Sequence, residues 1–336
     1  MVATLKDLGE KEIIRTLIKP LLNPGNSLFL AGDDCGVIQV SDDKCVCLST
    51  DRVPADLISY KLGLLSYDQL GYYLGVLNIS DVIASGSKPA GLLLNLAFDS
   101  DFPVDSFQSI VEGAKRACDD YDCHIIGGDL SHSEEMSISA TSIGIGDINK
   151  ILYRKGAKAG DFIYCSSFIG LTSTAFSYYL RAKPKGFTLS EKEEQLLATQ
   201  FQKPVAKYKL SQLLIQSGHQ VTAMDNTDGA GQSYQELAEI NSLRFELDLK
   251  KLPIHEVTYK VAKFLDESPE SIALGGGADF QLLGTIDSSF VGSFSNELIN
   301  EGLTVIGVCM TGSGLFLNDG AQTTEYTNPG WNYFSR

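Results

Sequence analysis

The sequence has no long apolar run and no stretch rich in lysine or arginine along its 336 residues. A membrane-spanning helix needs about 18 or more consecutive apolar residues, and a secretory signal needs an apolar core. Residues 1–14 carry charged side chains where that core would lie. The 27 basic and 42 acidic side chains give a net charge of −15, which repels phosphate backbones. We therefore expect a cytoplasmic protein that binds neither membranes nor nucleic acid.

Familiar phosphate-binding motifs are also missing. The sequence contains no G-x-x-x-x-G-K-S/T loop, and it has neither the H-R-D nor the D-F-G motif of protein kinases. If this chain handles ATP, it does so with another fold. The seven cysteines are an odd number, and Cys45 and Cys47 lack the spacing of a zinc knuckle or a redox pair. We expect reduced, mostly buried thiols.

The composition and length favour a globular protein of two domains. Apolar residues make up 43% and charged residues 21% of the chain, which is ordinary for a folded protein. The chain is longer than the roughly 100 to 200 residues of one domain. A polar, glycine-bearing stretch at 153–161 suggests a boundary just before it. We therefore expect an N-terminal domain over 1–148 and a C-terminal domain over 149–336.

Apolar periodicity predicts strands and helices in both halves. In the first half it predicts strands at 44–49, 92–98 and 136–141, and helices at 66–86 and 104–122. In the second half it predicts strands at 162–165, 221–224, 280–286 and near Val305, and helices from Thr172 and over 205–217. Residues 182–203 read as a polar segment. The fold class is therefore α+β, with α and β elements mixed.

The positions of the aspartates are the most informative feature. Most stand where an apolar strand ends or beside glycine, at positions 33, 34, 51, 129, 225 and 228. Asp81 lies within an otherwise apolar helix, where a buried carboxylate needs a cation or hydrogen bonds. Converging carboxylates repel one another unless a divalent cation neutralises them, and oxygen ligands alone favour magnesium over zinc. Magnesium held in this way commonly presents ATP phosphates.

Each acidic motif also has a purely structural interpretation. Asp33 and Asp34, like Gly127-Gly128-Asp129, suit an ordinary turn. Asp225 and Asp228 suit the start of a helix, where the helix dipole favours negative charge. The joint pattern, in this order and spacing, is much less expected by chance than any single member.

The ordered motifs cover nearly the whole chain. They are residues 32–38, 49–51, 78–89, 127–129, 154–161, 225–229, 273–283 and 330–334. Together they resemble the motifs of the thiamine-monophosphate kinase family, within the aminoimidazole-ribonucleotide synthetase-like superfamily. The resemblance implies a two-domain fold whose N-terminal domains pair in a homodimer, with ATP bound in a groove near that interface. It implies direct in-line transfer of a phosphoryl group from ATP to thiamine phosphate, giving thiamine diphosphate and ADP.

The resemblance also assigns roles to individual residues. Several magnesium ions would be held by Asp33, Asp34, Ser49, Thr50, Asp51, Asp81, Asp129, Asp225 and Asp228. Of these, Asp51, Asp129 and Asp228 are the expected catalytic residues. ATP would be met by Gly128, Arg154 and Thr227. The acceptor would be met at the positions of Ile58, Ala278, Asp279, Gln281 and Trp331.

This chain departs from the family pattern mainly on the acceptor side, although residues 225–230 also read D-N-T-D-G-A where the family has D-I-S-D-G-L. Ile58 stands where the family has a histidine, and Ala278 and Gln281 replace the two glutamates of its G-G-E-D-Y-E-L motif. Two alternatives to thiamine phosphate kinase activity therefore stay open. The first is a paralogue that phosphorylates or activates a different small molecule, and the second is a non-catalytic nucleotide-binding protein.

Overall fold

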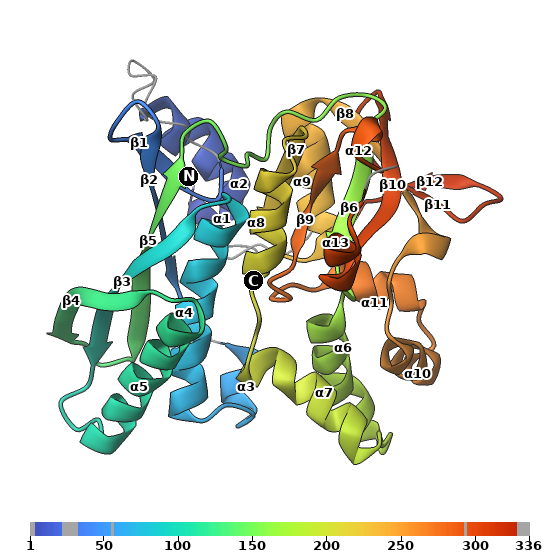
Figure 1. The fold of residues 1–336 in the computed structure, drawn as a ribbon. Helices are drawn as coiled ribbons and strands as arrows, with labels where there is room; N and C mark the ends of the chain where they lie inside the picture. The colour runs from blue at the N-terminus through green and yellow to red at the C-terminus, as the bar shows by residue number, and fades with distance from the viewer. Residues whose placement is uncertain (1–3, 22–32, 55–56, 292–293, 328–336) are drawn as a thin grey trace.

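The computed structural model describes residues 4–21, 33–54, 57–291 and 294–327. Within these residues the chain forms two mixed sheets, each packed with helices (Figure 1). This arrangement confirms the α+β fold class. No helix in the described part of the chain is both long enough and apolar enough to span a bilayer.

The strands divide between the sheets according to their place in the sequence. The first sheet has the order β1-β2-β5-β3-β4, with β1 (Gly36–Gln39), β2 (Lys44–Arg52), β3 (Lys88–Phe98), β4 (His124–His132) and β5 (Ser137–Asp147). The second has the order β12-β11-β8-β10-β6-β9-β7, with β6 (Phe162–Ser166), β7 (Val221–Asp225), β8 (Leu243–Asp248), β9 (Leu282–Ile286), β10 (Leu303–Thr311), β11 (Gly314–Asn318) and β12 (Thr323–Glu325). The chain passes from one sheet to the other through residues 148–161.

The helices include long ones against each sheet and several short ones. They are α1 (Leu5–Leu8), α2 (Glu10–Ile13), α3 (Ile58–Lys61), α4 (Tyr67–Ala84), α5 (Val104–Asp120), α6 (Leu171–Ser177), α7 (Glu191–Gln202), α8 (Tyr208–Gln216), α9 (Ala230–Asn241), α10 (Glu256–Leu265), α11 (Pro269–Gly275), α12 (Ser288–Val291) and α13 (Asn296–Asn300). A short π-helical turn, η3 (Tyr178–Ala182), continues α6.

Helix α4 is the central element of the first half. Ser66 caps its start: its hydroxyl accepts from the backbone N–H of Gln69 at 3.2 Å, and the backbone N–H of Ser66 donates to the side-chain oxygen of Gln69 at 2.9 Å. A side chain at Gly71 would lie 1.9 Å from the carbonyl of Ile110 in α5, and one at Gly113 would meet α4 equally closely. The glycines therefore let α4 and α5 pack backbone against backbone.

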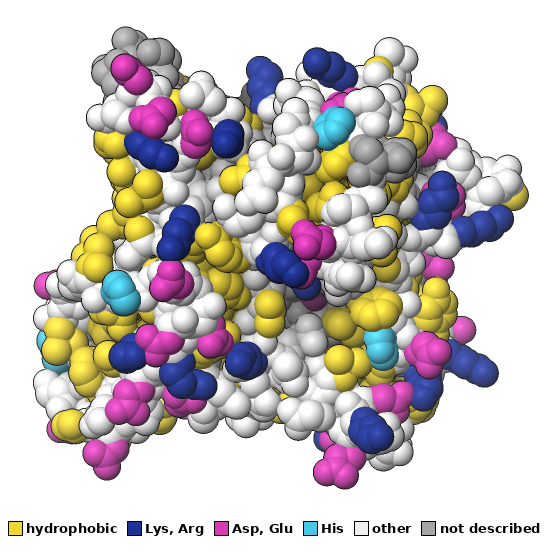
Figure 2. All heavy atoms as spheres, viewed as in Figure 1, with side chains coloured by type: hydrophobic (Ala, Val, Ile, Leu, Met, Phe, Trp, Pro, Cys, Tyr) yellow, Lys and Arg dark blue, Asp and Glu magenta, His cyan; other side chains and the backbone are white. Residues whose placement is uncertain are grey.

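Helices α4 and α5 cover one face of the first sheet, and among the described residues no helix covers the other face to the same extent. Strand alternation points Cys45, Cys47 and Ile138 toward the helices, where they are buried. Ile145 and Ile126 lie toward the other side and are about half exposed, at 52% and 54%. Hydrophobic side chains gather over these strands at the left of Figure 2. We refer to this side, with β4 at its edge, as the open face.

The helices and strands predicted from apolar periodicity are confirmed, but the interpretation of one segment was wrong. The predicted helices at 66–86 and 104–122 appear as α4 and α5, and the strand at 44–49 appears as β2. The stretch 182–203, read as merely polar, contains α7, which Ser190 and Glu193 cap and which buries only Leu197 and Phe201. Because this segment has few apolar residues among many charged ones, its sequence shows no clear helical periodicity. Gly127-Gly128-Asp129, which also suited a turn, lies within strand β4.

Candidate active site

A cavity of about 640 Å³ opens between the two halves of the chain. Its walls come from the loop before β1, from β2 and α4 of the first half, and from α6, η3, the end of β7 and the 275–278 loop of the second. The lining residues include Asp33, Asp34, Ser49, Asp51, Ile58, Asp81, Arg154, Asp225, Thr227, Asp228 and Ala278. The structure therefore brings together eleven of the residues that the sequence singled out.

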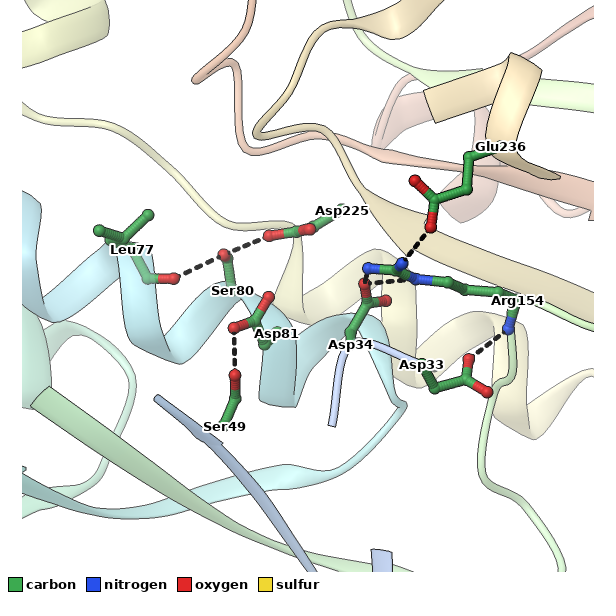
Figure 3. Close-up of polar contacts among 9 residues, drawn as sticks. All are labelled: Asp33, Asp34, Ser49, Leu77, Ser80, Asp81, Arg154, Asp225 and Glu236. Atoms are coloured by element: carbon green, nitrogen blue, oxygen red, sulfur yellow. Dashed lines mark hydrogen bonds and ion pairs between the residues drawn. The ribbon is translucent and has the colours of Figure 1, made fainter. Parts of the chain in front are cut away.

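Three carboxylates converge on one point of this cavity. Oxygen atoms of Asp34, Asp81 and Asp225 lie within 4.8 Å of one another (Figure 3). Two serines orient them: Ser49 donates to Asp81 at 2.6 Å, and Ser80 donates to Asp225 at 2.5 Å. Asp225 reaches this point from the end of β7, 145 residues after Ser80. The cluster therefore depends on the contact between the two halves of the chain.

Arg154 lies beside this cluster and interacts with three carboxylates. Its guanidinium pairs with Asp34, and it also contacts Glu236 of α9 at 2.7 Å. The backbone N–H of Arg154 donates to Asp33 at 2.6 Å (Figure 3). Its side chain is only 17% exposed. Arg154 thus places a buried positive charge next to the carboxylates.

One arginine does not neutralise this many carboxylates. Burial raises the pKa of Asp34 to about 6 although Arg154 opposes the shift, and burial together with the charge of Asp34 raises the pKa of Asp225 to about 8. Burial, followed by the charges of Asp225 and Asp51, raises the pKa of Asp81 well above its usual value. Burial also raises the pKa of Asp51. A divalent cation among these groups would stabilise their charged forms.

The donor set fits magnesium. Asp34, Asp81 and Asp225 offer only hard carboxylate oxygens, with neither histidine nor cysteine among the three clustered ligand atoms. Asp51 and Asp228 line the same cavity and offer further oxygens. Two serine donors fix the carboxylates that would bind the ion. We call Asp33, Asp34, Asp51, Asp81, Asp225 and Asp228 the carboxylate end of the cavity.

The cavity continues along α4 into an apolar end. Tyr73, Leu77 and Asp81 are four residues apart, so they line one side of the helix. Tyr73 lies about 12 Å from Asp81 along the axis, at about 1.5 Å per residue. The surrounding wall is mostly apolar. We call this region the apolar end, formed by Pro54, Leu57, Ile58, Tyr73, Leu77, Phe176 and Leu180.

Three predicted residues lie elsewhere on the first sheet. Ser49 and Asp51 line the cavity, but Thr50 between them points to the open face, because side chains alternate along a strand. Thr50 there donates to the carbonyl of Ala140 at 2.9 Å and accepts from Thr141 at 3.2 Å. Gly128 and Asp129 lie on edge strand β4 and are exposed. Within one chain, these three residues are therefore not part of the cavity.

Gly128 has a structural role of its own. Its φ of +153° is a conformation that favours glycine. A side chain there would come within 1.9 Å of the carbonyl oxygen of Leu94 in β3. Only glycine therefore allows β4 to pair with β3 at this position.

Two predicted acceptor residues lie behind the cavity wall, and one lies outside the described residues. Asp279 accepts backbone N–H bonds from Gly170 at 2.6 Å and Thr172 at 2.9 Å, so its carboxylate caps the start of α6. Gln281 is buried and donates to the carbonyl of Phe168. Neither residue lines the cavity. Trp331 lies in the part of the chain that the structure does not describe.

Several site residues were not predicted. Glu236, Arg52, Phe176, Leu180 and Arg181 gave no signal, because their role depends on contacts between distant segments. Ser80 and Asn78 carried a weak signal. They stand one and three residues before Asp81 in a helix that is buried nearly all round, where polar side chains need partners. Asn78 accepts the backbone N–H of Asp51 at 2.9 Å.

Known proteins resemble this chain over nearly its whole length. Residues 32–146 match the family described as AIR synthase related protein, N-terminal domain. A thiamine-monophosphate kinase of Aquifex aeolicus is 28% identical over 332 residues, covering 98% of this chain and 99% of that protein. One of Haemophilus influenzae is 26% identical, covering 97% and 98%. The solved structure of AaThiL complexed with AMPPCP and TMP matches with a TM-score of 0.82 at 26% identity and covers 99% of both chains.

Proposed function

This chain belongs to the thiamine-monophosphate kinase family, and from that premise we propose that it transfers the γ-phosphoryl group of ATP to a small phosphate monoester, with magnesium required. Thiamine phosphate is the first acceptor to test, with thiamine diphosphate and ADP as products. The observation that carries the proposal is the convergence of Asp34, Asp81 and Asp225 beside Arg154, in a cavity with an apolar end. Seven free, buried cysteines suit the reducing cytoplasm that we propose as its compartment.

The reaction needs positioning and charge rather than a protein nucleophile. An oxygen of the acceptor phosphate bonds to the γ-phosphorus while the bond to the β,γ-bridging oxygen breaks, and ADP leaves with that electron pair. Asp34, Asp81 and Asp225 would hold magnesium, with Asp51 and Asp228 as further ligands. Magnesium, when bound, neutralises charge on the transferring group.

The chain's own residues would then arrange the two substrates. Arg154, fixed by Asp34 and Glu236, lies where it can contact phosphate oxygens, and Thr227 lines the same wall. The apolar end would hold the body of the acceptor with its phosphate toward the carboxylate end. Because both substrates lie in one cavity, positioning supplies a large part of the rate.

A direct assay tests this proposal. We expect ADP release that requires both magnesium and an acceptor, and a new diphosphate signal in the phosphorus NMR spectrum when thiamine phosphate is supplied. ADP release that is unchanged when the acceptor is omitted would point to simple ATP hydrolysis. Absence of both ADP and diphosphate, with ATP bound, would support a non-catalytic nucleotide-binding protein.

We also propose that the chain acts as a homodimer through the open face. Ile126 and Ile145 are half exposed there, and both lie on strands of one continuous surface. Thr50 and Asp129 lie on the same face, away from the cavity. Their predicted contact with metal or nucleotide would therefore require a second copy of the chain to cover the open face. Light scattering should give a dimeric mass that Ile145→Lys halves. The control Val104→Lys changes another exposed apolar residue, on α5, and should remain dimeric. A monomeric wild type would contradict the proposal.

A further inference from the structure

Backbone hydrogen bonds join two segments of the second half of the chain at the cavity wall. We call residues 225–228, which include two of the cavity's carboxylates, the ligand loop, and residues 278–281 the bridging segment. The carbonyl of Asn226 accepts from the backbone N–H groups of Asp279 at 3.0 Å and Phe280 at 3.1 Å. The position of the ligand loop therefore depends on the position of the bridging segment.

The backbone of the bridging segment is strained. Ala278 has a φ of +64° and Phe280 a φ of +53°, a left-handed conformation that is uncommon for residues other than glycine. Such conformations persist where the surrounding contacts determine them, and they are frequent at functional sites. Here the backbone sends adjacent side chains to different helices: the carboxylate of Asp279 caps α6, whereas the ring of Phe280 packs against α4.

Phe280 connects the second half of the chain to helix α4. Its side chain is 1% exposed and is not among the described residues that line the cavity. The ring packs edge-on against Tyr73 of α4, with ring centroids 5.5 Å apart and an angle of 79° between the rings. Phe280 shares an apolar core with Leu70 and Leu74 of α4, whereas Leu283 belongs to the core of the second sheet. Because Tyr73 lines the apolar end, its contact with Phe280 lies directly behind that wall.

We infer that Phe280 is a positioning residue, which sets the distance between the ligand loop and Tyr73 at the apolar end. The inference rests on the proposed function, because it concerns how two substrates are placed in the same cavity. The backbone of Phe280 is bonded to the ligand loop and its ring packs on Tyr73, so a shift at this residue moves one relative to the other. In-line transfer needs the acceptor oxygen close to the γ-phosphorus, and a small misplacement lowers the rate without preventing either substrate from binding.

A matched pair of substitutions separates positioning from stability. Phe280→Leu and Phe245→Leu each replace a buried ring by a smaller apolar side chain, and both should lower the Tm. Phe245 lies in β8, within the core of the second sheet, and is not among the described lining residues. We would measure kcat and both KM values with magnesium, ATP and thiamine phosphate, well below either Tm. Phe280→Leu should lower kcat at least about tenfold and change each KM by less than about threefold, whereas Phe245→Leu should keep the wild-type constants.

A double-mutant cycle tests whether Phe280 acts through Tyr73. Tyr73→Leu removes the other ring of the pair. If the contact between the rings fixes the spacing, adding Phe280→Leu to Tyr73→Leu should lower kcat by less than about threefold, compared with at least about tenfold in the wild-type background. If Phe280→Leu does not fold, Phe280→Met fills more of the ring's volume and takes its place in the cycle, with the same expected results.

The outcomes separate this inference from the proposed function. Wild-type kcat in Phe280→Leu, or an equal loss of kcat in Phe245→Leu, would overturn the inference and leave the kinase proposal standing. Independent losses that multiply in the double variant would also overturn it, because Phe280 would then not act through Tyr73. A wild-type protein that releases no ADP with magnesium, ATP and thiamine phosphate would contradict the proposed function, and the inference would fail with it.

Discussion

The carboxylate end and the apolar end of the cavity both include residues of α4, but different interactions stabilise them. At the carboxylate end, Asp81 and Asp225 are buried close together, and Arg154 and two serines offset part of their charge. At the apolar end, Tyr73 and Ile58 need nothing beyond packing. We propose that the first region needs a cation to offset its carboxylates, whereas the second does not. The donor half of the reaction should therefore depend on metal and charge, and the acceptor half on size and polarity.

Neutralising one carboxylate should have the largest effect on activity. Asp225→Asn, like Asp51→Asn, removes an oxygen ligand with full charge, and we expect turnover to fall about 100- to 1,000-fold or more. The fold should survive, because the change also relieves repulsion within the cluster. Asp122→Asn is the control: Asp122 forms an exposed pair with Lys88 at 2.7 Å and should keep wild-type activity. Wild-type turnover in Asp225→Asn would contradict the claim that the carboxylate end depends on its charge.

Arginines at the two ends should differ in their contribution to stability. Arg154→Met leaves Asp34 and Glu236 without their buried partner, and we expect about 3 kcal/mol less stability to unfolding. Arg181 pairs with Glu267 at the surface with a side chain 47% exposed, so Arg181→Met should cost no more than about 1 kcal/mol. Denaturant unfolding measures both. Equal losses of stability in the two variants would mean that the carboxylate end does not depend on the buried positive charge of Arg154.

Asp279→Asn should distinguish a cap from a substrate contact. The carboxylate of Asp279 accepts from the backbone N–H groups of Gly170 and Thr172, so Asn should cost about 1–2 kcal/mol of stability. If α6 then shifts, the KM for the acceptor should rise while ATP binding stays unchanged. A higher KM with unchanged thermal stability would support the direct acceptor contact that the sequence predicted.

The effect of pH on stability should be smaller than the effects of these substitutions, and stability should fall as the pH rises. Burial and the charge of Asp34 raise the pKa of Asp225 to about 8, so the folded state holds this proton more tightly than the unfolded state does. That contribution is complete below the ordinary pKa of 3.8 and is lost as the pH rises toward about 8. The Tm of metal-free protein should therefore fall over this range, and less steeply in Asp225→Asn. A steeper fall in the variant would contradict the assigned cause.

Much of the fold could be predicted from the sequence because it rests on local patterns. The apolar period and the Ser66 cap located α4, and a continuous run of apolar residues located β2. Alternation along that strand could also have separated Thr50 from Ser49 and Asp51, since neighbouring strand residues face opposite ways. Helix α7 was missed because only Leu197 and Phe201 are buried in it.

The site was less predictable because it forms between distant segments. Asp34 and Asp225 were predicted as metal ligands, but their partners Arg154, Glu236 and Ser80 meet them only in the folded chain. The role of Asp279 depends on where α6 begins relative to the 275–281 loop, which no local pattern encodes.

Titration of ATP into the protein by calorimetry, with magnesium or with excess EDTA, tests the central claim most directly. We predict binding in magnesium and binding about 100-fold weaker or absent in EDTA, because Asp34, Asp81 and Asp225 would otherwise repel the phosphates. Equal affinity in both buffers would contradict the claim that this carboxylate cluster exists to hold a cation for ATP.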